Sequence, residues 1–208
     1  MKKLIVAAGM PRSGSTWLYN AVRLLLENTG LLDIGAGWIG DFNTFKNHDV
    51  VILKIHNYEP VIATNAALIF YSYRDVRDAL ASFKRKFGDE PSLAQARAFI
   101  ENDTKWREKA SFIMKYEEMI AAREKTLGDI ARCLEITDAN LAHIEQDIDT
   151  MNYARGGLKN DTYHLENLLH KNHITDGRHG SWKGCLSDGL VTQIETELKD
   201  WLLCNGYR

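Results

Sequence analysis

Short apolar runs alternate with longer segments of helical spacing along most of this chain. That alternation limits the number of possible folds more than any other feature of the sequence. The runs are rich in Ile, Val, Phe or Tyr and lack polar alternation, which is typical of strands buried on both faces of a parallel sheet. They are Leu4–Ala8, Val50–Ile55, Ala67–Tyr73 and Ser111–Tyr116. We therefore predict four strands of one buried sheet.

The segments between and after these runs have apolar residues at the three- and four-residue spacing of amphipathic helices. The first begins after Ser15 and ends at Asn28 and Gly30. The others are Val76–Lys86, Leu93–Ala110, Ala121–Leu134, Ala139–Ile148 and Leu190–Cys204, with Thr137 as the expected cap of the fifth and Gly206 after the last. Strands alternating with helices imply right-handed βαβ units. We expect a three-layer α/β/α fold with a central, mostly parallel sheet.

Length and composition restrict the class of protein further. The 208 residues fit a single domain over residues 1–208, and a net charge of -2 gives no reason to expect a nucleic-acid partner. The longest uncharged run, Pro60–Tyr73, is too short to span a bilayer, and Leu4–Ala8 is too short for a secretory signal. The three cysteines are odd in number and lack a CxxC pair, so we expect free thiols and a cytoplasmic protein.

A glycine-bearing turn joins the first predicted strand to the first predicted helix. The sequence Gly9-Met-Pro-Arg12-Ser13-Gly14-Ser15-Thr16 has the glycine spacing of a nucleotide-triphosphatase loop, with Ser15 in place of its lysine. Backbone N–H groups and the helix dipole make such a turn an anion site, and the planar Arg12 fork suits a tetrahedral oxyanion. The alternative is an ordinary turn capped by Ser13 or Ser15.

The segment Pro11–Trp17 resembles the 5′-phosphosulfate loop of sulfotransferases that use 3′-phosphoadenosine 5′-phosphosulfate (PAPS). Many members of that family carry Lys where this chain has Arg12. The resemblance implies a P-loop-like site in which the 5′-phosphate is held by Ser13, Gly14, Ser15 and Thr16, with Trp17 packed near the nucleotide.

Arg74 and Ser82, eight residues apart, are similar to the family's site for the 3′-phosphate. Arg74 follows a predicted strand and Ser82 lies two turns into the next helix, so both side chains can face one phosphate. The alternative is an ordinary helix start, in which Asp75 or Asp78 favours the helix dipole and Arg74 is solvated.

Lys54 and His56 resemble the family's Lys-x-His at the catalytic centre. Alternation places both on the same side of a strand, near its carboxyl end. A histidine there can accept the proton of an attacking hydroxyl, because its unperturbed pKa is about 6.5. The alternatives are that His56 is only a hydrogen-bonded neighbour, or that Glu59 is the base.

Two later segments complete the resemblance. Tyr116 lies in a segment like the family's Tyr-Glu-Asp, in which Tyr contacts adenine; otherwise it is a core aromatic residue. The segment Arg178–Lys183 resembles a late loop that closes on the 3′-phosphate, which assigns that role to Arg178, Gly180 and, in place of the usual Lys, His179.

The reaction that the resemblance implies is sulfuryl transfer from PAPS to an acceptor hydroxyl of a carbohydrate, lipid or small alcohol, with 3′-phosphoadenosine 5′-phosphate (PAP) as product. His56 is the expected base, Arg12 and Lys54 neutralise developing charge, and no metal is required. The alternatives are a kinase or nucleotide hydrolase that uses Mg-ATP, and a non-catalytic nucleotide-binding module.

The acceptor is left open by the sequence. We expect specificity to depend on loops around Leu31–Asn47 and Thr150–Asn172. The second of these belongs to a long loop region from Thr150 to Asp188. That region contains His164, His170, His173 and His179, whose spacing matches no structural zinc pattern. The short chain leaves little room for a lid, so we expect an open cleft or a contact between copies in a homo-oligomer.

Overall fold

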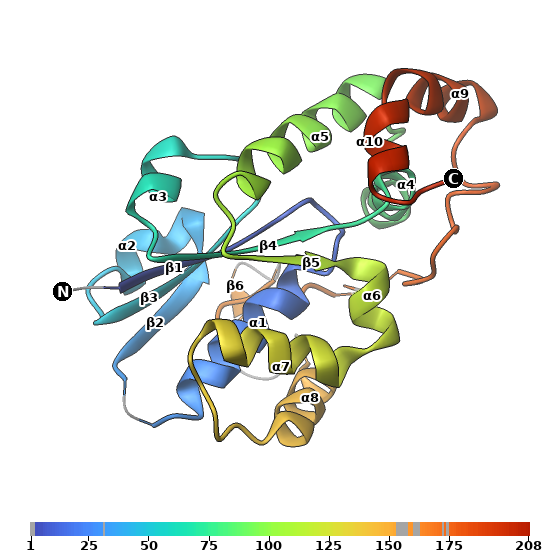
Figure 1. Cartoon of the computed structure of the whole chain (residues 1–208). Coiled ribbons are helices and arrows are strands. Elements are labelled where there is room, and N and C mark those ends of the chain that lie inside the picture. The colour runs from blue at the N-terminus through green and yellow to red at the C-terminus, as the bar shows by residue number, and fades with distance from the viewer. Residues whose placement is uncertain (1–2, 31, 153–157, 160–162, 172, 174) are drawn as a thin grey trace.

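The central feature of the computed structural model is a parallel sheet of five strands in the order β2-β3-β1-β4-β5 (Figure 1). The structure describes residues 3–30, 32–152, 158–159, 163–171, 173 and 175–208. The strands are β1 (Lys3–Gly9), β2 (Ile34–Trp38), β3 (Val50–Ile55), β4 (Leu68–Tyr73) and β5 (Phe112–Lys115). Because all of them are parallel, their carboxyl ends share one edge of the sheet. The predicted α/β class and all four predicted strands are confirmed.

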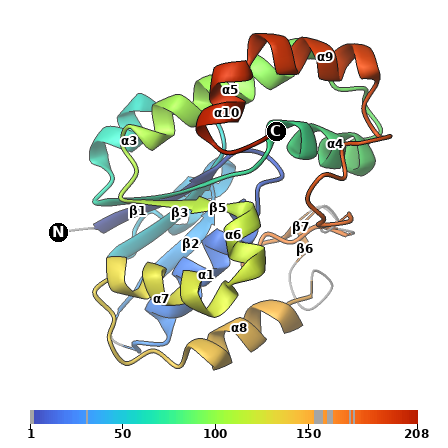
Figure 2. The same ribbon diagram turned by 45° about the vertical axis from the view of Figure 1, so that its right-hand side comes forward.

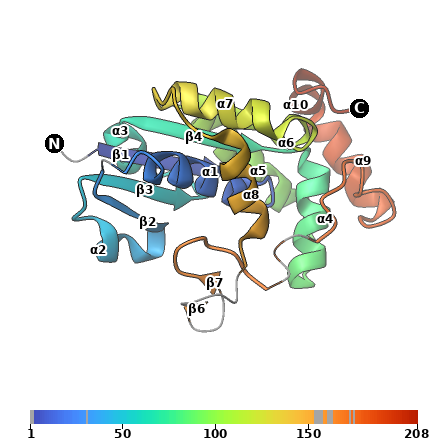
Figure 3. The same ribbon diagram turned by 90° about the horizontal axis from the view of Figure 1, so that it is seen from below.

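Helices cover both faces of the sheet, as predicted for strands that are buried on both sides. One apolar cluster joins a face of the sheet to α1 (Ser15–Glu27), α6 (Tyr116–Ala121), α7 (Arg123–Cys133) and α8 (Leu141–Thr150). The other joins the opposite face to α3 (Pro60–Asn65), α4 (Val76–Phe87), α5 (Leu93–Arg107), α9 (Asp188–Glu197) and α10 (Lys199–Cys204). Figure 2 shows the two groups on opposite sides of the sheet, and Figure 3 looks onto the α1, α7 and α8 side.

The strand β2 was not predicted, because its sequence Ile-Gly-Ala-Gly-Trp has little strand propensity. Glycines are required in β2 because the short helix α2 (Phe42–Phe45) and His48 after it pack closely on this strand. A Cβ on Gly35 would lie 2.4 Å from the His48 ring, and one on Gly37 would lie 2.5 Å from the Phe45 ring. The segment that was expected to be a loop at the acceptor site is therefore an edge strand with a helix packed closely against it.

One predicted helix is divided in the structure. The last one is α9 followed by α10, with the break at Leu198. The helix predicted at Ala121–Leu134 is α7, and the short helix α6 before it was not predicted. The expected cap Thr137 is also wrong: Asn140 caps α8, accepting a hydrogen bond from the His143 N–H at 3.1 Å.

The region from Thr150 to Asp188 contains more structure than a loop. β6 (Leu158–Lys159) pairs antiparallel with β7 (Tyr163–His164), and Tyr163 forms a further bridge with His170. Parts of the two stretches expected to set specificity, residues 31, 153–157, 160–162 and 172, lie outside the described residues. The three cysteines are free, as expected. No helix in the described ranges is long and apolar enough to cross a membrane.

Candidate functional site

The turn after β1 is held tightly against the neighbouring strand β4. The Ser13 hydroxyl is buried and lies 2.7 Å from the Met10 carbonyl oxygen and 2.7 Å from the Ser72 hydroxyl. A Cβ on Gly9 would lie 2.3 Å from Ser72 Oγ, so only glycine fits there. Ser13 thus serves to fix the turn on the sheet, and its side chain does not line the cavity beside it.

Backbone conformation at the turn aims the start of α1 toward the same cavity. Gly14 precedes the helix with φ +78°, a left-handed conformation that glycine adopts without strain, and Arg12 also has a positive φ of 67°. A Cβ on Gly14 would lie 3.0 Å from the Tyr116 ring, so the ring packs directly on the turn. The N-terminus of α1, with Ser15 and Thr16, faces the cavity.

A cavity of about 270 Å³ lies at the carboxyl edge of the sheet, where ligands bind in folds of this class. Of the residues predicted from the sequence, those that line it are Arg12, Gly14, Ser15, Thr16, Lys54, His56, Arg74, Ser82 and Tyr116. His170 and His173, two of the four histidines noted in the sequence, also line it, as do Phe83, Lys86, Phe87 and Thr175, which the sequence did not indicate. Among the described lining residues there are four Lys or Arg side chains and no Asp or Glu. The cavity is built to receive an anion.

The Arg12 guanidinium reaches across the cavity to two other parts of the chain. Its Nε donates to Ser82 Oγ at 3.0 Å, and its Nη2 donates to the His173 carbonyl oxygen at 2.7 Å. Burial, followed by the nearby Arg74, lowers the pKa of Arg12 to about 10. Arg12 therefore remains charged at neutral pH and sits in a strongly positive field.

Lys54 and His56 lie beside each other at the end of β3. Lys54 Nζ is 3.5 Å from His56 Nε2 and 5.1 Å from the centroid of the Trp38 ring, which pairs with Lys54 across the sheet. Burial and then the charge of Arg12 lower the pKa of Lys54 to about 7. Lys54 is thus poised between its charged and neutral forms, and the negative charge of a bound anion would favour the charged form.

The His56 ring is held in one tautomer. Its Nδ1 lies 2.6 Å from the carbonyl oxygen of Gly9. Because a carbonyl oxygen only accepts, Nδ1 carries the proton, and in the neutral ring Nε2 keeps its lone pair. Burial, followed by the charge of Lys54, lowers the pKa of His56 to about 3, so the imidazole is neutral at pH 7. Glu59, the alternative base, is exposed at the start of α3 and does not line the cavity.

Arg74 is buried at the end of β4. Its Nη2 donates to the Arg178 carbonyl oxygen at 2.6 Å, and its guanidinium lies 4.3 Å from the centroid of the Tyr116 ring. Its buried Nε has no hydrogen-bond partner among the described residues. Such a group is costly unless something else satisfies it. Ser82, on α4, contacts the Thr175 hydroxyl at 3.1 Å in addition to Arg12.

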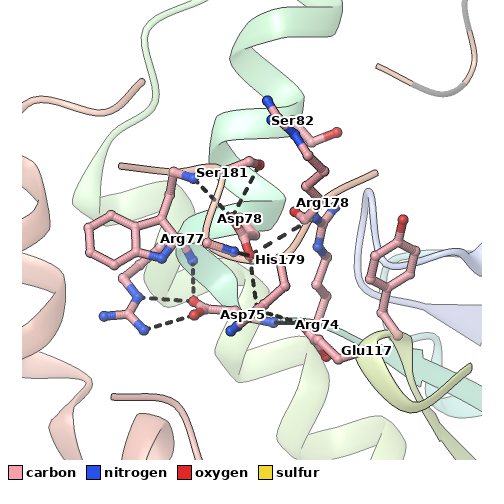
Figure 4. A network of polar contacts seen from close by, with 12 residues as sticks. Arg74, Asp75, Arg77, Asp78, Ser82, Glu117, Arg178, His179 and Ser181 are labelled. Atoms are coloured by element: carbon pink, nitrogen blue, oxygen red, sulfur yellow. Dashed lines mark hydrogen bonds and ion pairs between the residues drawn. The ribbon is translucent and has the colours of Figure 1, made fainter. Parts of the chain in front are cut away.

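Residues 163–171, 173 and 175–182, which we name the late segment, pass over this edge of the sheet. Asp78 of α4 anchors the segment, since its carboxylate accepts from the backbone N–H of Gly180 at 2.8 Å and of Trp182 at 2.9 Å (Figure 4). The Arg77 guanidinium lies 4.4 Å from the centroid of the Trp182 ring. These contacts fix residues 180–182 on α4.

The predicted site residues Arg178, His179 and Gly180 are beside the cavity without lining it. The Arg178 side chain is 80% exposed and pairs with Asp176 at 3.2 Å. His179 Nδ1 lies 3.4 Å from Asp78 Oδ2. Trp17 likewise packs against the core cluster on the α1 side and does not line the cavity. The structure therefore brings nine of the predicted site residues together around the cavity and leaves these four and Ser13 outside its lining.

The four histidines of the late segment do not gather into one cluster. His164 Nδ1 accepts from the backbone N–H groups of Glu166 and Asn167, both at 3.2 Å, so it stabilises a turn. His170 and His173 stack at 5.6 Å in the cavity, and His179 lies near Asp78 and Glu117. The ligand atoms of that last trio lie within 4.8 Å of one another, but Asp78 already accepts from the late segment.

The sequence matches no protein-family model and no curated protein. Solved structures are similar in fold. Mouse sulfotransferase SULT7A1 complexed with PAP matches with a TM-score of 0.68 and 17% identity, covering 97% of this chain and 84% of that one. Retinol dehydratase with androsterone and the inactive cofactor PAP matches at 0.63 and 13%, covering 97% and 81%. Retinol dehydratase with retinol and PAP matches at 0.59 and 14%, covering 97% and 82%. The chain therefore has the fold of these sulfotransferase structures.

Proposed function

We propose that this protein is a PAPS-dependent sulfotransferase that moves a sulfuryl group to the hydroxyl of an acceptor molecule. The observation that carries the proposal is the convergence of Arg12, Lys54 and Arg74 with a neutral His56 around one cavity. The fold supports it, because each of the three structures named above holds PAP.

The donor nucleotide would meet fixed positive groups at both of its phosphate ends. The turn after β1 offers the N-terminus of α1 and Arg12 to the 5′ end. Arg74 and Ser82 line the same cavity, and the Arg74 Nε, which has no partner among the described residues, would donate to a 3′-phosphate oxygen. Charge-assisted hydrogen bonds of this kind would distinguish PAPS from ATP.

Transfer requires a proton acceptor beside the attacking hydroxyl. In the proposed step the acceptor oxygen bonds to sulfur, the bond between sulfur and the 5′-phosphate oxygen breaks, and PAP leaves. The hydroxyl proton passes to Nε2 of His56, whose tautomer keeps a lone pair there. Lys54, 3.5 Å from that nitrogen, would turn to the bridging oxygen on which charge develops.

The low pKa of His56 in the ligand-free protein fits this sequence of events. The charge of Lys54 is the second cause of the shift, after burial. A bound polyanion beside Lys54 would offset that charge and raise the pKa of His56 toward its ordinary value. His56 would then become an effective base only after the donor has bound.

The acceptor side of the cavity favours an alcohol with an apolar body. Phe83 and Phe87 form a pair at 4.6 Å on one face of α4, and both line the cavity. Retinol dehydratase, one of the similar structures, is seen with androsterone and with retinol. We propose a small alcohol, lipid or glycan with an apolar surface as acceptor.

Nucleotide binding separates this proposal from its rivals. Isothermal titration calorimetry should show that PAP binds without a divalent metal, and more tightly than ATP with Mg²⁺. Labelled PAPS should then transfer its sulfuryl group to at least one member of a panel of hydroxyl acceptors. Tighter binding of Mg-ATP would favour a kinase or nucleotide hydrolase. Tight binding of PAP with no transfer to any acceptor or to water would indicate a non-catalytic binding module.

A further inference from the structure

His173 is a half-buried histidine of the late segment that lines the cavity and has no part in the proposed reaction so far. Its backbone carbonyl accepts from Arg12, which fixes this residue to the turn after β1. Its ring shares the cavity with Lys54 and His56, and the charges on Lys54 and Arg12 both act on it. The cavity thus holds imidazoles from distant parts of the chain, His56 at the end of β3 and the stacked pair His170 and His173 of the late segment.

The hydrogen bonds of the two rings assign them opposite tautomers. Nδ1 of His56 lies against a carbonyl oxygen and must carry a proton. Nδ1 of His173 lies 3.4 Å from the backbone N–H of His170, which only donates, so this nitrogen must present a lone pair. In neutral rings the remaining nitrogens are then opposite in kind: Nε2 of His56 accepts, whereas Nε2 of His173 donates.

Both rings are neutral in the physiological range. Burial is the largest cause that lowers the pKa of each, and each reaches about 3. Nearby cations add to the effect, Lys54 for His56 and Arg12 for His173. No residue that the structure describes forms a hydrogen bond with Nε2 of His173. Because His173 lines the cavity, a molecule bound there can accept a hydrogen bond from this N–H.

We infer that His56 and His173 hold the acceptor hydroxyl between them, with the hydroxyl donating to Nε2 of His56 and accepting from Nε2–H of His173. The inference rests on the proposed function and adds a second substrate-contacting residue to it. The two hydrogen bonds fix the orientation of the oxygen, so that its other lone pair points at sulfur. When the bond to sulfur forms, the proton moves to His56 and the hydrogen bond from His173 stays in place.

This arrangement selects oxygen acceptors. An alcohol or water has two lone pairs, one for His173 and one for the bond to sulfur. A neutral amine has a single lone pair, which cannot both accept from His173 and attack sulfur. The pair of tautomers thus favours hydroxyl acceptors over amines of the same size.

The tautomers can be observed directly in the ligand-free protein. Two-bond ¹H–¹⁵N correlation spectra of imidazole-labelled protein at pH 7 should show the Nδ1–H form for His56 and the Nε2–H form for His173. Loss of each pattern in His56→Ala and His173→Leu assigns the signals. The same tautomer in both rings, or a charged His173 ring at pH 7, would overturn the inference even if PAP binds as proposed.

The role in transfer is tested by two matched variants and by a reaction in which water is the acceptor. Release of PAP from PAPS should fall roughly five- to tenfold in His173→Leu, as expected for one lost hydrogen bond. It should be largely restored in His173→Gln, whose amide can donate from a similar position. The Kd for PAP should stay within about twofold of wild type in both variants.

Several results would count against His173 without touching the proposed function. These are equal losses in the Leu and Gln variants, no loss in either, or preferential transfer to benzylamine over benzyl alcohol. Absence of PAP binding by the wild-type protein would instead contradict the proposed function itself. The NMR result would then still decide whether the two tautomers exist.

Discussion

The two sides of the cavity, the early side and the late segment, are held in place in different ways. The early side consists of residues at strand ends, which the sheet itself places: the turn after β1, Lys54, His56, Arg74 and Tyr116. The late segment is joined to them through its own backbone: carbonyl oxygens of His173, Gly177 and Arg178 accept from Arg12, Tyr116 and Arg74. Local sequence thus specifies one side of the site, and tertiary contacts to backbone groups specify the other.

The sharpest way to test the early side is to remove the proposed base. His56→Ala should lower turnover at least about a hundredfold, the lower range for a general base, because Nε2 of His56 is the proposed acceptor of the hydroxyl proton. The Kd for PAP should hardly change. The measurement is single-turnover kinetics with labelled PAPS, with calorimetry of PAP as the control. Unchanged turnover would remove His56 from the mechanism and direct attention to Glu59.

Arg74 belongs to the early side and donates a hydrogen bond to the late segment, at the Arg178 carbonyl oxygen. Its loss should weaken nucleotide binding rather than lower turnover. Arg74→Ala should weaken PAP binding roughly 10- to 100-fold, the range for a hydrogen bond to a charged group. Binding of adenosine 5′-phosphate, which lacks the 3′-phosphate, should change far less. Arg97→Ala is the matched control, because Arg97 is exposed and its partner among the described residues is Glu197, away from the cavity lining. Equal losses for both nucleotides would contradict the 3′-phosphate assignment.

The same contrast explains how much of the molecule could be predicted from the sequence. Alternation along a strand predicted Lys54 and His56 on one side of β3, and both line the cavity. Arg74 and Ser82 were identified through the resemblance, and they line the same cavity. β2 could not be predicted, because its glycines are needed only to make room for the rings of His48 and Phe45, which lie further along the chain.

The late segment was the hardest part to predict, again because tertiary contacts rather than local sequence determine its position. Its contacts to the early side use carbonyl oxygens, which every residue type supplies, so side-chain identity carries little signal there. His173 belongs to a histidine-rich stretch that the sequence singled out, yet only tertiary contacts separate it from His164 and His179. By contrast, Lys86 lies four residues after Ser82 on the same helix face and could have been found by extending that face one turn.

Titration of Lys54 predicts that the affinity for PAP depends on pH, through a residue of the early side alone. In the ligand-free protein its pKa is lowered to about 7 by burial and by Arg12, so Lys54 loses its charge as the pH rises through that value. An anion binds the charged form better. The affinity for PAP should therefore be level below about pH 7 and fall about tenfold from pH 6.5 to 8.5, with uptake of a proton on binding.

Calorimetry in buffers of different ionisation enthalpy measures that proton uptake directly. Lys54→Arg is the control, since its guanidinium stays charged over the whole range and should give a flat profile. A profile in Lys54→Arg that still falls through pH 7 would assign the titration to another group.

The smallest expected effect comes from Trp38, whose ring lies 5.1 Å from Lys54 Nζ. The face of an indole stabilises a nearby ammonium by about 0.5–2 kcal/mol, so Trp38→Leu should lower the pKa of Lys54 by roughly 0.4–1.5 units. The fall in PAP affinity would then begin at a lower pH, and affinity at pH 7 would drop a few-fold. Trp38→Phe keeps an aromatic face and should shift the profile less. Because Trp38 also packs against the core, the melting temperature of each variant is compared. Loss of stability alone would lower the melting temperature without moving the midpoint, so an unmoved midpoint in Trp38→Leu would mean that the ring supports the sheet and has no influence on the charge of Lys54.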